Sequence, residues 1–477
     1  MAKPEAVEIK RRPIEMYREV LEGDFERLKA AAAHARVAFE GRTIWHVNST
    51  AKGGGVAEIL QGYLPFVSDA GVDIRWLVLK ERAEFFGLTK RIHNLLHGYP
   101  GDGVGLGPDE VKLYEDVASD SASYLLEMIK PRDVVFLHDP QTAGLVPLIK
   151  QGGATVIWRC HIGADRSNSQ VDTAIGFLSP YVEWADSCVF SRSSYVWTGL
   201  PEQKTQVISP AIDPFSPKNQ VLDEKTVDGI LKTIGISAGV ATVPPEFARS
   251  DGTRGLVERS AEIHQSGPVP DDAPLIVQVS RWDLLKDHGG LMTAFGLMPE
   301  DGAAHLALVG PASGAVSDDP EGEAVFAELL EHRQRLDERV RDRIHIVNLP
   351  MDELEENAVM VNALQRRADI LVQKSLAEGF GLTVAEGMWK GRPVVASAVG
   401  GINDQIVNGE SGILIDDPSD FPAFAKAFET LLSDPQLSER IGRAATERIT
   451  AQFLSLPRLS DYSDLIARIE GGAIASP

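Results

Sequence analysis

The chain has 477 residues, of which 43% are hydrophobic and 24% are charged, and its formal net charge at pH 7 is −22. This length predicts about two to four domains, each with a hydrophobic core of its own. The negative charge argues against nucleic acids and anionic membranes as partners, because long-range repulsion opposes the approach to a polyanion.

The N-terminal region, up to about residue 40, predicts one or two helices, because apolar residues recur at helical spacing among charged ones. Its opening residues lack the apolar segment of a secretory signal. No run of about 18 apolar residues exists that could span a membrane. We therefore expect a cytoplasmic protein.

A first strand is predicted at residues 43–48, followed by a glycine-rich loop and an apolar helix over about 56–70. The triplet Gly53–Gly55 allows backbone amides to meet a ligand at the positive start of that helix. The dinucleotide fingerprint of oxidoreductases fails here, because Glu58 occupies the position that requires Gly or Ala. A tight turn without a ligand is the alternative interpretation.

Further strands of this half are predicted at 73–79, 133–138, 154–159 and 186–191, with helices or loops between them. This alternation predicts a parallel, doubly wound sheet, in which ligands bind at the carboxyl ends of the strands.

Two polar clusters fall at such strand ends, at residues 138–141 and 158–161. A single histidine after a strand is more often structural than catalytic, but two such positions in one half of the chain favour a site. Cys160 has no base motif beside it and is expected to be a small buried residue. Cys160 and Cys188 are too few for a disulfide framework and lack metal-ligand spacing, so we expect both to be reduced.

A further strand is predicted to end near residue 207, and the proline-rich residues at 207–214 predict a linker at the end of the first domain. The segment 237–272, rich in Gly, Ala, Ser, Pro and Asp, predicts a long irregular loop. A second sheet starts at 274–280 and is followed directly by Arg281 and Lys286, whose charged groups could converge on one phosphate. Taken alone, both residues are better interpreted as solvated side chains of a loop.

The second sheet continues with strands predicted at 304–309, 343–347, 368–373 and 393–396, and helices follow over about 418–470.

The stretch 374–391 predicts a strand end, a glycine-bearing loop and the first turns of a helix. Gly379 and Gly381 allow a tight turn, and the helix that begins near Thr383 points its first amides at an anion. Glu378 and Glu386 flank this anion site, and their carboxylates suit the hydroxyl groups of a sugar or ribose. The alternative is a buried junction whose glutamates cap the helix.

Three sequence motifs carry a family resemblance. EGFGLTVAE, at 378–386, resembles the donor-site motif of retaining GT-B glycosyltransferases of the glycogen-synthase-like group. HVNSTAKGGGVAEIL, at 46–60, resembles the first βα unit of the trehalose-forming members of that group. VSRWDLLKD, at 279–287, is similar to the family's Arg and Lys pair that stabilises the donor diphosphate and its leaving charge.

The resemblance implies an α/β protein of GT-B fold, with two Rossmann-like doubly wound domains that face each other across a cleft. The expected N-terminal, acceptor-side domain covers residues 1–212, and the C-terminal helix at 455–477 packs back on it. The expected donor-binding domain covers 213–454.

The resemblance also implies the roles of the site residues. Those expected to be catalytic are Arg281, Lys286, Glu378 and His161. Those expected to bind the donor are Gly54, Gly55, Arg281, Lys286, Gly381, Leu382, Thr383 and Glu386. Those expected to bind the acceptor are Asp139, Gln141 and Asn48. Within these groups, Glu378 and His161 would contact the donor sugar and Glu386 the ribose.

The implied activity is that of a hexosyltransferase that joins glucose from a nucleotide-glucose donor to free glucose and forms trehalose. A trehalose phosphorylase, which uses glucose 1-phosphate and phosphate, is the alternative. A nucleotide-sugar-binding regulator without turnover is an alternative of another class, and the complete set of site residues argues against it.

The expected partners are small-molecule substrates, and the resemblance is compatible with a homodimer. We find no metal-binding motif and expect no required cofactor, because the Arg and Lys pair can supply the positive charge often supplied by Mg²⁺. The nucleobase of the donor is not predicted.

Overall fold

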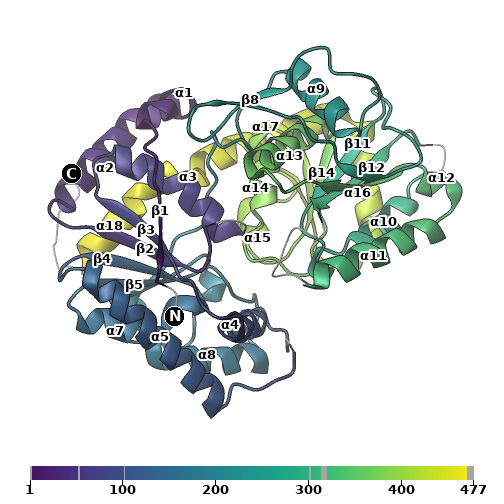
Figure 1. Ribbon diagram of the computed structural model, residues 1–477. Coiled ribbons are helices and arrows are strands. Elements are labelled where there is room, and N and C mark those ends of the chain that lie inside the picture. The colour runs from purple at the N-terminus through teal and green to yellow at the C-terminus, as the bar shows by residue number, and fades with distance from the viewer. Residues whose placement is uncertain (1–2, 52–53, 101, 300–301, 313–319, 470–477) are drawn as a thin grey trace. The chain divides into compact units, whose positions relative to one another are not determined.

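The computed structural model describes residues 3–51, 54–100, 102–299, 302–312 and 320–469 (Figure 1). The chain divides into two compact units. The first unit comprises the chain up to Ala211 together with the chain from Leu454 onward, and the second is Ile212–Phe453. Gly53 of the glycine triplet and residues 470–477 of the expected C-terminal helix lie outside the described residues.

The first unit contains a seven-stranded sheet with the order β1-β3-β2-β4-β5-β6-β7. Its strands are β1 (Glu5–Val7), β2 (Ile44–Asn48), β3 (Ile74–Val78), β4 (Val134–His138), β5 (Thr155–Cys160), β6 (Ser187–Phe190) and β7 (Thr205–Val207). All neighbours are parallel except β1, which pairs antiparallel with β3. The strands predicted for this half are confirmed. The prediction missed β1, because three residues are too few to show an alternating pattern.

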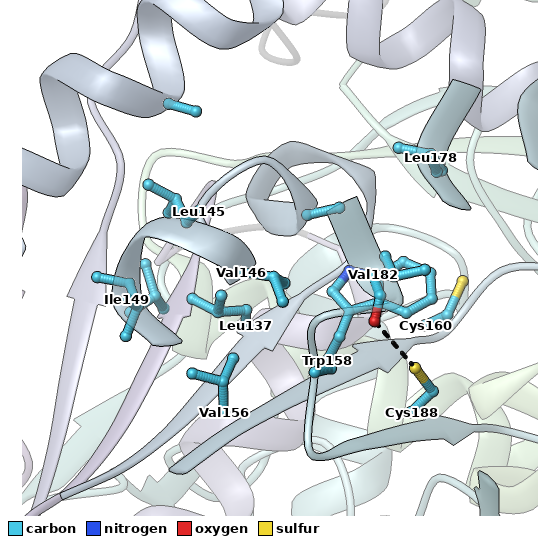
Figure 2. Packing of buried hydrophobic residues seen from close by; sticks show 14 of the residues in the cluster. Leu137, Leu145, Val146, Ile149, Val156, Trp158, Cys160, Leu178, Val182 and Cys188 are labelled. Atoms are coloured by element: carbon cyan, nitrogen blue, oxygen red, sulfur yellow. Dashed lines mark hydrogen bonds between the residues drawn. The ribbon is translucent and has the colours of Figure 1, made fainter. Parts of the chain in front are cut away.

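The helices of the first unit cover both faces of the sheet. They are α1 (Arg18–Leu21), α2 (Phe25–Ala38), α3 (Gly55–Asp69), α4 (Ala83–Leu96), α5 (Pro108–Met128), α6 (Pro140–Ala143), α7 (Val146–Gln151), α8 (Ser169–Val182) and α18 (Leu459–Ile469). One face forms a core with α4, α5, α7 and α8. Figure 2 shows part of this core, where Leu137, Val156 and Trp158 of β4 and β5 pack with Val146 of α7 and Val182 of α8.

The opposite face of this sheet carries the side chains that matter for the site. Successive residues of a strand point to opposite faces, so His46, His138 and Arg159 lie opposite the core drawn in Figure 2. Helices α2, α3 and α18 cover this face, and α18 packs along α2. The C-terminal helix thus belongs to the first unit although it is far from β2 in sequence.

The second unit contains a seven-stranded sheet with the order β10-β13-β12-β11-β14-β15-β16. Its strands are β10 (Glu262–His264), β11 (Leu275–Val279), β12 (His305–Pro311), β13 (Ile344–Leu349), β14 (Ile370–Gln373), β15 (Val394–Ser397) and β16 (Ile413–Ile415). Its helices are α9 (Glu224–Ile234), α10 (His288–Gly296), α11 (Pro320–Arg335), α12 (Glu338–Arg341), α13 (Leu354–Arg367), α14 (Leu382–Trp389), α15 (Ile402–Gln405), α16 (Phe421–Ser433) and α17 (Pro435–Gln452).

The segment 237–272 is not an irregular loop throughout, and that prediction was wrong. It contains a hairpin of β8 (Glu246–Ala248) and β9 (Arg254–Leu256), followed by β10. Strand β10 pairs antiparallel with β13, and Nδ2 of Asn348 donates to a carboxylate oxygen of Glu262 at 2.9 Å. Each of these strands has only three residues, too few to show an alternating pattern, and the partner of β10 is distant in the sequence, so local composition did not reveal them.

Each sheet has one point at which the order of its parallel strands reverses. The reversal lies between β2 and β4 in the first unit and between β11 and β14 in the second. Crossovers leave such a point in opposite directions, so a crevice for ligands forms at the carboxyl ends of the two strands. None of the helices in the described ranges is long and apolar enough to cross a bilayer.

Candidate active site

The reversal point of the second unit brings Lys286 and Glu378 together. Lys286 ends a short 3-10 turn after β11, and Glu378 lies in the loop after β14. Nζ of Lys286 donates to Oε2 of Glu378 at 2.6 Å, and both side chains are about 15% exposed. Two predicted catalytic residues, 92 positions apart, therefore form one largely buried ion pair.

A second ion pair, with one buried partner, holds the loop that carries Lys286. Asp287, the next residue, is bonded to Nζ of Lys374, whose side chain is fully buried. The Lys374 ammonium also lies 4.9 Å from the ring centroid of Phe421, a favourable cation–π distance. Arg281 is half-exposed nearby in the sequence and pairs with Asp283 at 3.5 Å.

Helix α14 begins where the donor phosphate was expected. Gly381 precedes the helix with φ +83°, a left-handed conformation that favours glycine. Leu382 and Thr383 are the first residues of the helix, where backbone amides lack acceptors within it and face outward. Oγ1 of Thr383 donates to Gln373 at 2.8 Å, which ties the helix start to the end of β14.

Glu386 presents a carboxylate oxygen that no described residue satisfies. The side chain is buried, and Oε1 lies 3.5 Å from Nζ of Lys218, whereas Oε2 has no hydrogen-bond partner in the described ranges. Lys390, one helical turn later, donates to the main-chain oxygen of Glu386 at 3.2 Å. Burial lowers the pKa of Lys390 to about 7, against the opposing charge of Glu386. We call Arg281, Lys286, Glu378 and Glu386 the donor cluster.

The first unit places Asp139 and His161 together at its own reversal point. Asp139 follows β4 with φ +63°, and its Oδ1 accepts from the backbone amide of His161 at 2.7 Å. Burial raises the pKa of Asp139 to about 7, although the His161 amide and the Arg159 charge act in the opposite direction. This carboxyl group is therefore partly protonated near neutral pH.

His161 has a defined orientation at the end of β5. Its Nε2 accepts from Nε of Arg159 at 3.1 Å, while its Nδ1 is buried and has no hydrogen-bond partner among the described residues. Arg159 is itself buried, bonded to the hydroxyl group of Tyr462 on α18 and, at 3.2 Å, to the carbonyl group of Ile208. These contacts fix the guanidinium group that orients His161.

The other residues of the first unit that were predicted to bind substrates contribute mainly to the local fold. Asn48 accepts from Nε1 of Trp76 at 2.8 Å and donates to the carbonyl group of Thr50 at 2.7 Å, so it holds the turn after β2. Gln141 is half-buried on α6. Gly54 has φ +85° with open space around its Cα, so the backbone angle alone favours glycine there, and Gly55 begins α3.

Sequence analysis missed three residues at these sites. His46 and Tyr462 line the same pocket as His161, and Lys218 pairs with Glu386. The partners of these three residues are distant in sequence. The one local signal was that His46 lies between apolar residues of β2. Among the described residues, no group of three or more His, Cys, Asp and Glu side chains could hold a metal ion.

Two family models match the chain. Residues 46–197 match the N-terminal domain of trehalose synthase, and residues 259–448 match the glycosyl transferases of group 1. The first match begins at His46 and includes Asp139 and His161, and the second includes the whole donor cluster.

Similar proteins agree with these matches. The trehalose synthase of Rubrobacter xylanophilus is 35% identical over 435 residues, which cover 90% of this chain and 91% of the relative. The trehalose phosphorylase of Grifola frondosa is 26% identical over 84% of this chain and only 54% of the relative. Among solved structures, the alpha,alpha-trehalose-phosphate synthase (UDP-forming) of Burkholderia vietnamiensis aligns with a TM-score of 0.65 and 14% identity, covering 91% of this chain and 98% of that one. This likeness shows the GT-B fold.

The raised pKa of Asp139 predicts how the variant Asp139→Asn will change the pH dependence of stability. The folded protein holds the Asp139 proton more tightly than the unfolded chain, because burial raises the pKa from 3.8 to about 7. The contribution of this group to the free energy of unfolding therefore falls as pH rises from about 4 to about 7, and it is constant above.

We expect this fall to be absent from the Asp139→Asn protein, whose amide oxygen can still accept from His161. Urea denaturation of both proteins between about pH 4 and pH 8 measures the difference. Parallel curves for the two proteins would contradict the raised pKa.

Proposed function

Since this chain belongs to the trehalose synthase family, we propose that it transfers glucose from a nucleotide-glucose donor to free glucose and forms trehalose. It is a hexosyltransferase, because its second half is a group 1 glycosyltransferase domain and its relatives of near-equal length are trehalose synthases. The observation that carries the proposal is the Lys286–Glu378 ion pair beside the start of α14. This arrangement places a cation and a hydroxyl-binding carboxylate next to amides that suit a phosphate.

We propose a transfer in which the anomeric carbon of the donor glucose loses its bond to the diphosphate oxygen and gains one to the acceptor hydroxyl. The acceptor proton goes to the departing diphosphate, so the products are trehalose and a nucleoside diphosphate. Negative charge grows on the leaving group, and Lys286, Arg281 and the first amides of α14 are the groups that would stabilise it.

The contacts of the donor cluster support a division of roles. Glu378 would accept hydrogen bonds from glucose hydroxyl groups while it keeps Lys286 oriented. Glu386 would accept from a ribose hydroxyl group through Oε2, which has no partner among the described residues. Asp139, next to the His161 amide, would hold hydroxyl groups of the acceptor together with Gln141.

A phosphorylase is the second candidate activity. The G. frondosa phosphorylase aligns over only about half of its length and at lower identity than the synthases. The unsatisfied carboxylate oxygen of Glu386 also favours a donor with a ribose, because a phosphorylase has no ribose to bind. Both comparisons favour the synthase activity.

The first experiment tests the substrates directly. We expect trehalose, identified by NMR, when glucose is supplied with UDP-, ADP- or GDP-glucose, and none when it is supplied with glucose 1-phosphate. Trehalose with release of phosphate from glucose 1-phosphate would replace the synthase proposal with the phosphorylase. No disaccharide in any mixture would refute the acceptor assignment.

The role of Lys286 predicts a large loss of turnover in Lys286→Ala. We expect kcat to fall by about 100-fold or more, the effect typical of losing one group that stabilises charge in a transition state. Lys426→Ala, on the exposed side of α16, is the matched control and should keep wild-type kcat. Steady-state assays with saturating donor decide this, and equal kcat values for the two variants would contradict the assignment.

We further propose that the transfer needs no metal ion, since Arg281 and Lys286 supply positive charge at the phosphate position. Dialysis against EDTA is expected to leave the rate of trehalose formation unchanged, and added Mg²⁺ should not raise it. An increase of several-fold with Mg²⁺ would show that the two cations are insufficient.

A further inference from the structure

Three histidine rings form a continuous hydrogen-bonded chain on the face of the first sheet that α2, α3 and α18 cover. Nδ1 of His46 lies 3.0 Å from Nε2 of His138, and Nδ1 of His138 lies 3.2 Å from Nε2 of His161. Neighbouring rings are stacked, with centroids 5.3 and 5.5 Å apart. We call His46, His138 and His161 the imidazole chain.

Arg159 sets the direction of every hydrogen bond in this chain. Its Nε–H points at Nε2 of His161, and a guanidinium group always donates and never accepts. Nε2 of His161 therefore carries no proton. In a neutral imidazole the single proton must then be on Nδ1 of His161.

The same reasoning extends along the chain. Nδ1 of His138 faces the unprotonated Nε2 of His161 and must donate to it, which leaves Nε2 of His138 as an acceptor. Nδ1 of His46 faces that acceptor and must donate in turn. All three tautomers are thus assigned by the network, which begins at Arg159.

The surroundings keep the three rings neutral. Burial lowers the pKa of His46 to about 3, and the Arg159 charge acts in the same direction. Burial likewise holds the pKa values of His138 and His161 well below the usual range. A protonated ring would place a second cation beside the buried guanidinium group of Arg159.

The chain ends on an unused donor. Nδ1 of His161 is buried, and no described residue accepts its proton. Leaving a buried donor without an acceptor is destabilising, and most buried polar groups in proteins have a partner. The open end indicates an acceptor that arrives with the substrate.

We propose that His46 and His138 are positioning residues. They hold the His161 ring, whose Nδ1 proton is fixed by Arg159, so that this N–H points at an oxygen atom of the bound sugar. This inference rests on the proposed function, because it needs a sugar substrate at His161. His46 and His138 act only through His161 and contact no substrate themselves.

The variant His46→Phe tests this proposal. His46 stacks on Phe136 with ring centroids 4.7 Å apart and an angle of 3° between the ring planes. A phenyl ring therefore suits the position, and it removes the Nδ1–H that donates to His138. We expect kcat to fall by about tenfold, the effect of one misplaced hydrogen bond, with KM for glucose unchanged. His46→Asn, whose amide N–H replaces Nδ1–H, should restore most of kcat.

A double-variant cycle separates this role from general destabilisation. His138→Phe should lower kcat about as much, and His46→Phe should add nothing to it, because the first histidine acts through the second. The matched control is His305→Phe in the second sheet, where His305 bonds to His345 at 2.8 Å. That variant should keep wild-type kcat. Additive losses, or wild-type kcat in His46→Phe, would overturn the proposal.

A measurement without substrate distinguishes failure of this proposal from failure of the proposed function. NMR of the protein labelled with ¹⁵N in its histidine rings is expected to show protonated Nδ1 and unprotonated Nε2 at His161, and altered ring ¹⁵N shifts of His138 and His161 in His46→Phe. A proton on Nε2 of His161 would overturn the imidazole chain whatever the product. The expected tautomer without trehalose formation would leave the chain intact and refute the proposed function.

Discussion

The constraint on which this structure depends is that parallel strands buried on both faces end together at one edge of each sheet. There the strands give way to the loops that carry ligand-binding side chains, so polar side chains concentrate around the point where the strand order reverses. In the first unit that point collects His46, His138 and Arg159, and in the second it collects Lys286 and Glu378. The apolar cores that pack against the two sheets keep these groups in fixed positions.

A chain with a net charge of −22 can still bind an anion, because charges in salt solution are screened beyond roughly 10 Å. The charges close to a site therefore determine whether an anion binds there. A lone buried ammonium group would be strongly destabilising, which explains why Lys286 is paired with Glu378 and Lys374 with Asp287. The pairing also orients Lys286 before any substrate arrives. Its positive charge is then available to a phosphate without a costly rearrangement.

The sequence predicted what depends on neighbouring residues. Apolar runs marked the central strands, glycines such as Gly381 marked the tight turns, and the motifs marked Lys286, Glu378 and Glu386. It did not predict what depends on distant partners. Strand β10 forms by pairing with β13, Tyr462 contacts Arg159 from 303 residues away, and His46 contacts His138 of the adjacent strand β4, 92 residues away. Composition at 237–272 indicated a loop because no local signal records a pairing made elsewhere.

The second sheet offers a comparison for the imidazole chain. There, His305 and His345 lie on adjacent strands and are 2.8 Å apart, but Nδ1 of His345 faces Oε1 of Gln265 at 2.9 Å. An amide oxygen only accepts, so that pair is closed by the protein and its bonds are explained by the fold. In the imidazole chain the fixed neighbour of His161 is a guanidinium group, which only donates, and the N–H on Nδ1 of His161 has no acceptor among the described residues. Histidine side chains therefore stabilise the second sheet, whereas in the first sheet they present a hydrogen-bond donor to the site. The two cases differ because Gln265 accepts a hydrogen bond from His345, whereas Arg159 donates one to His161.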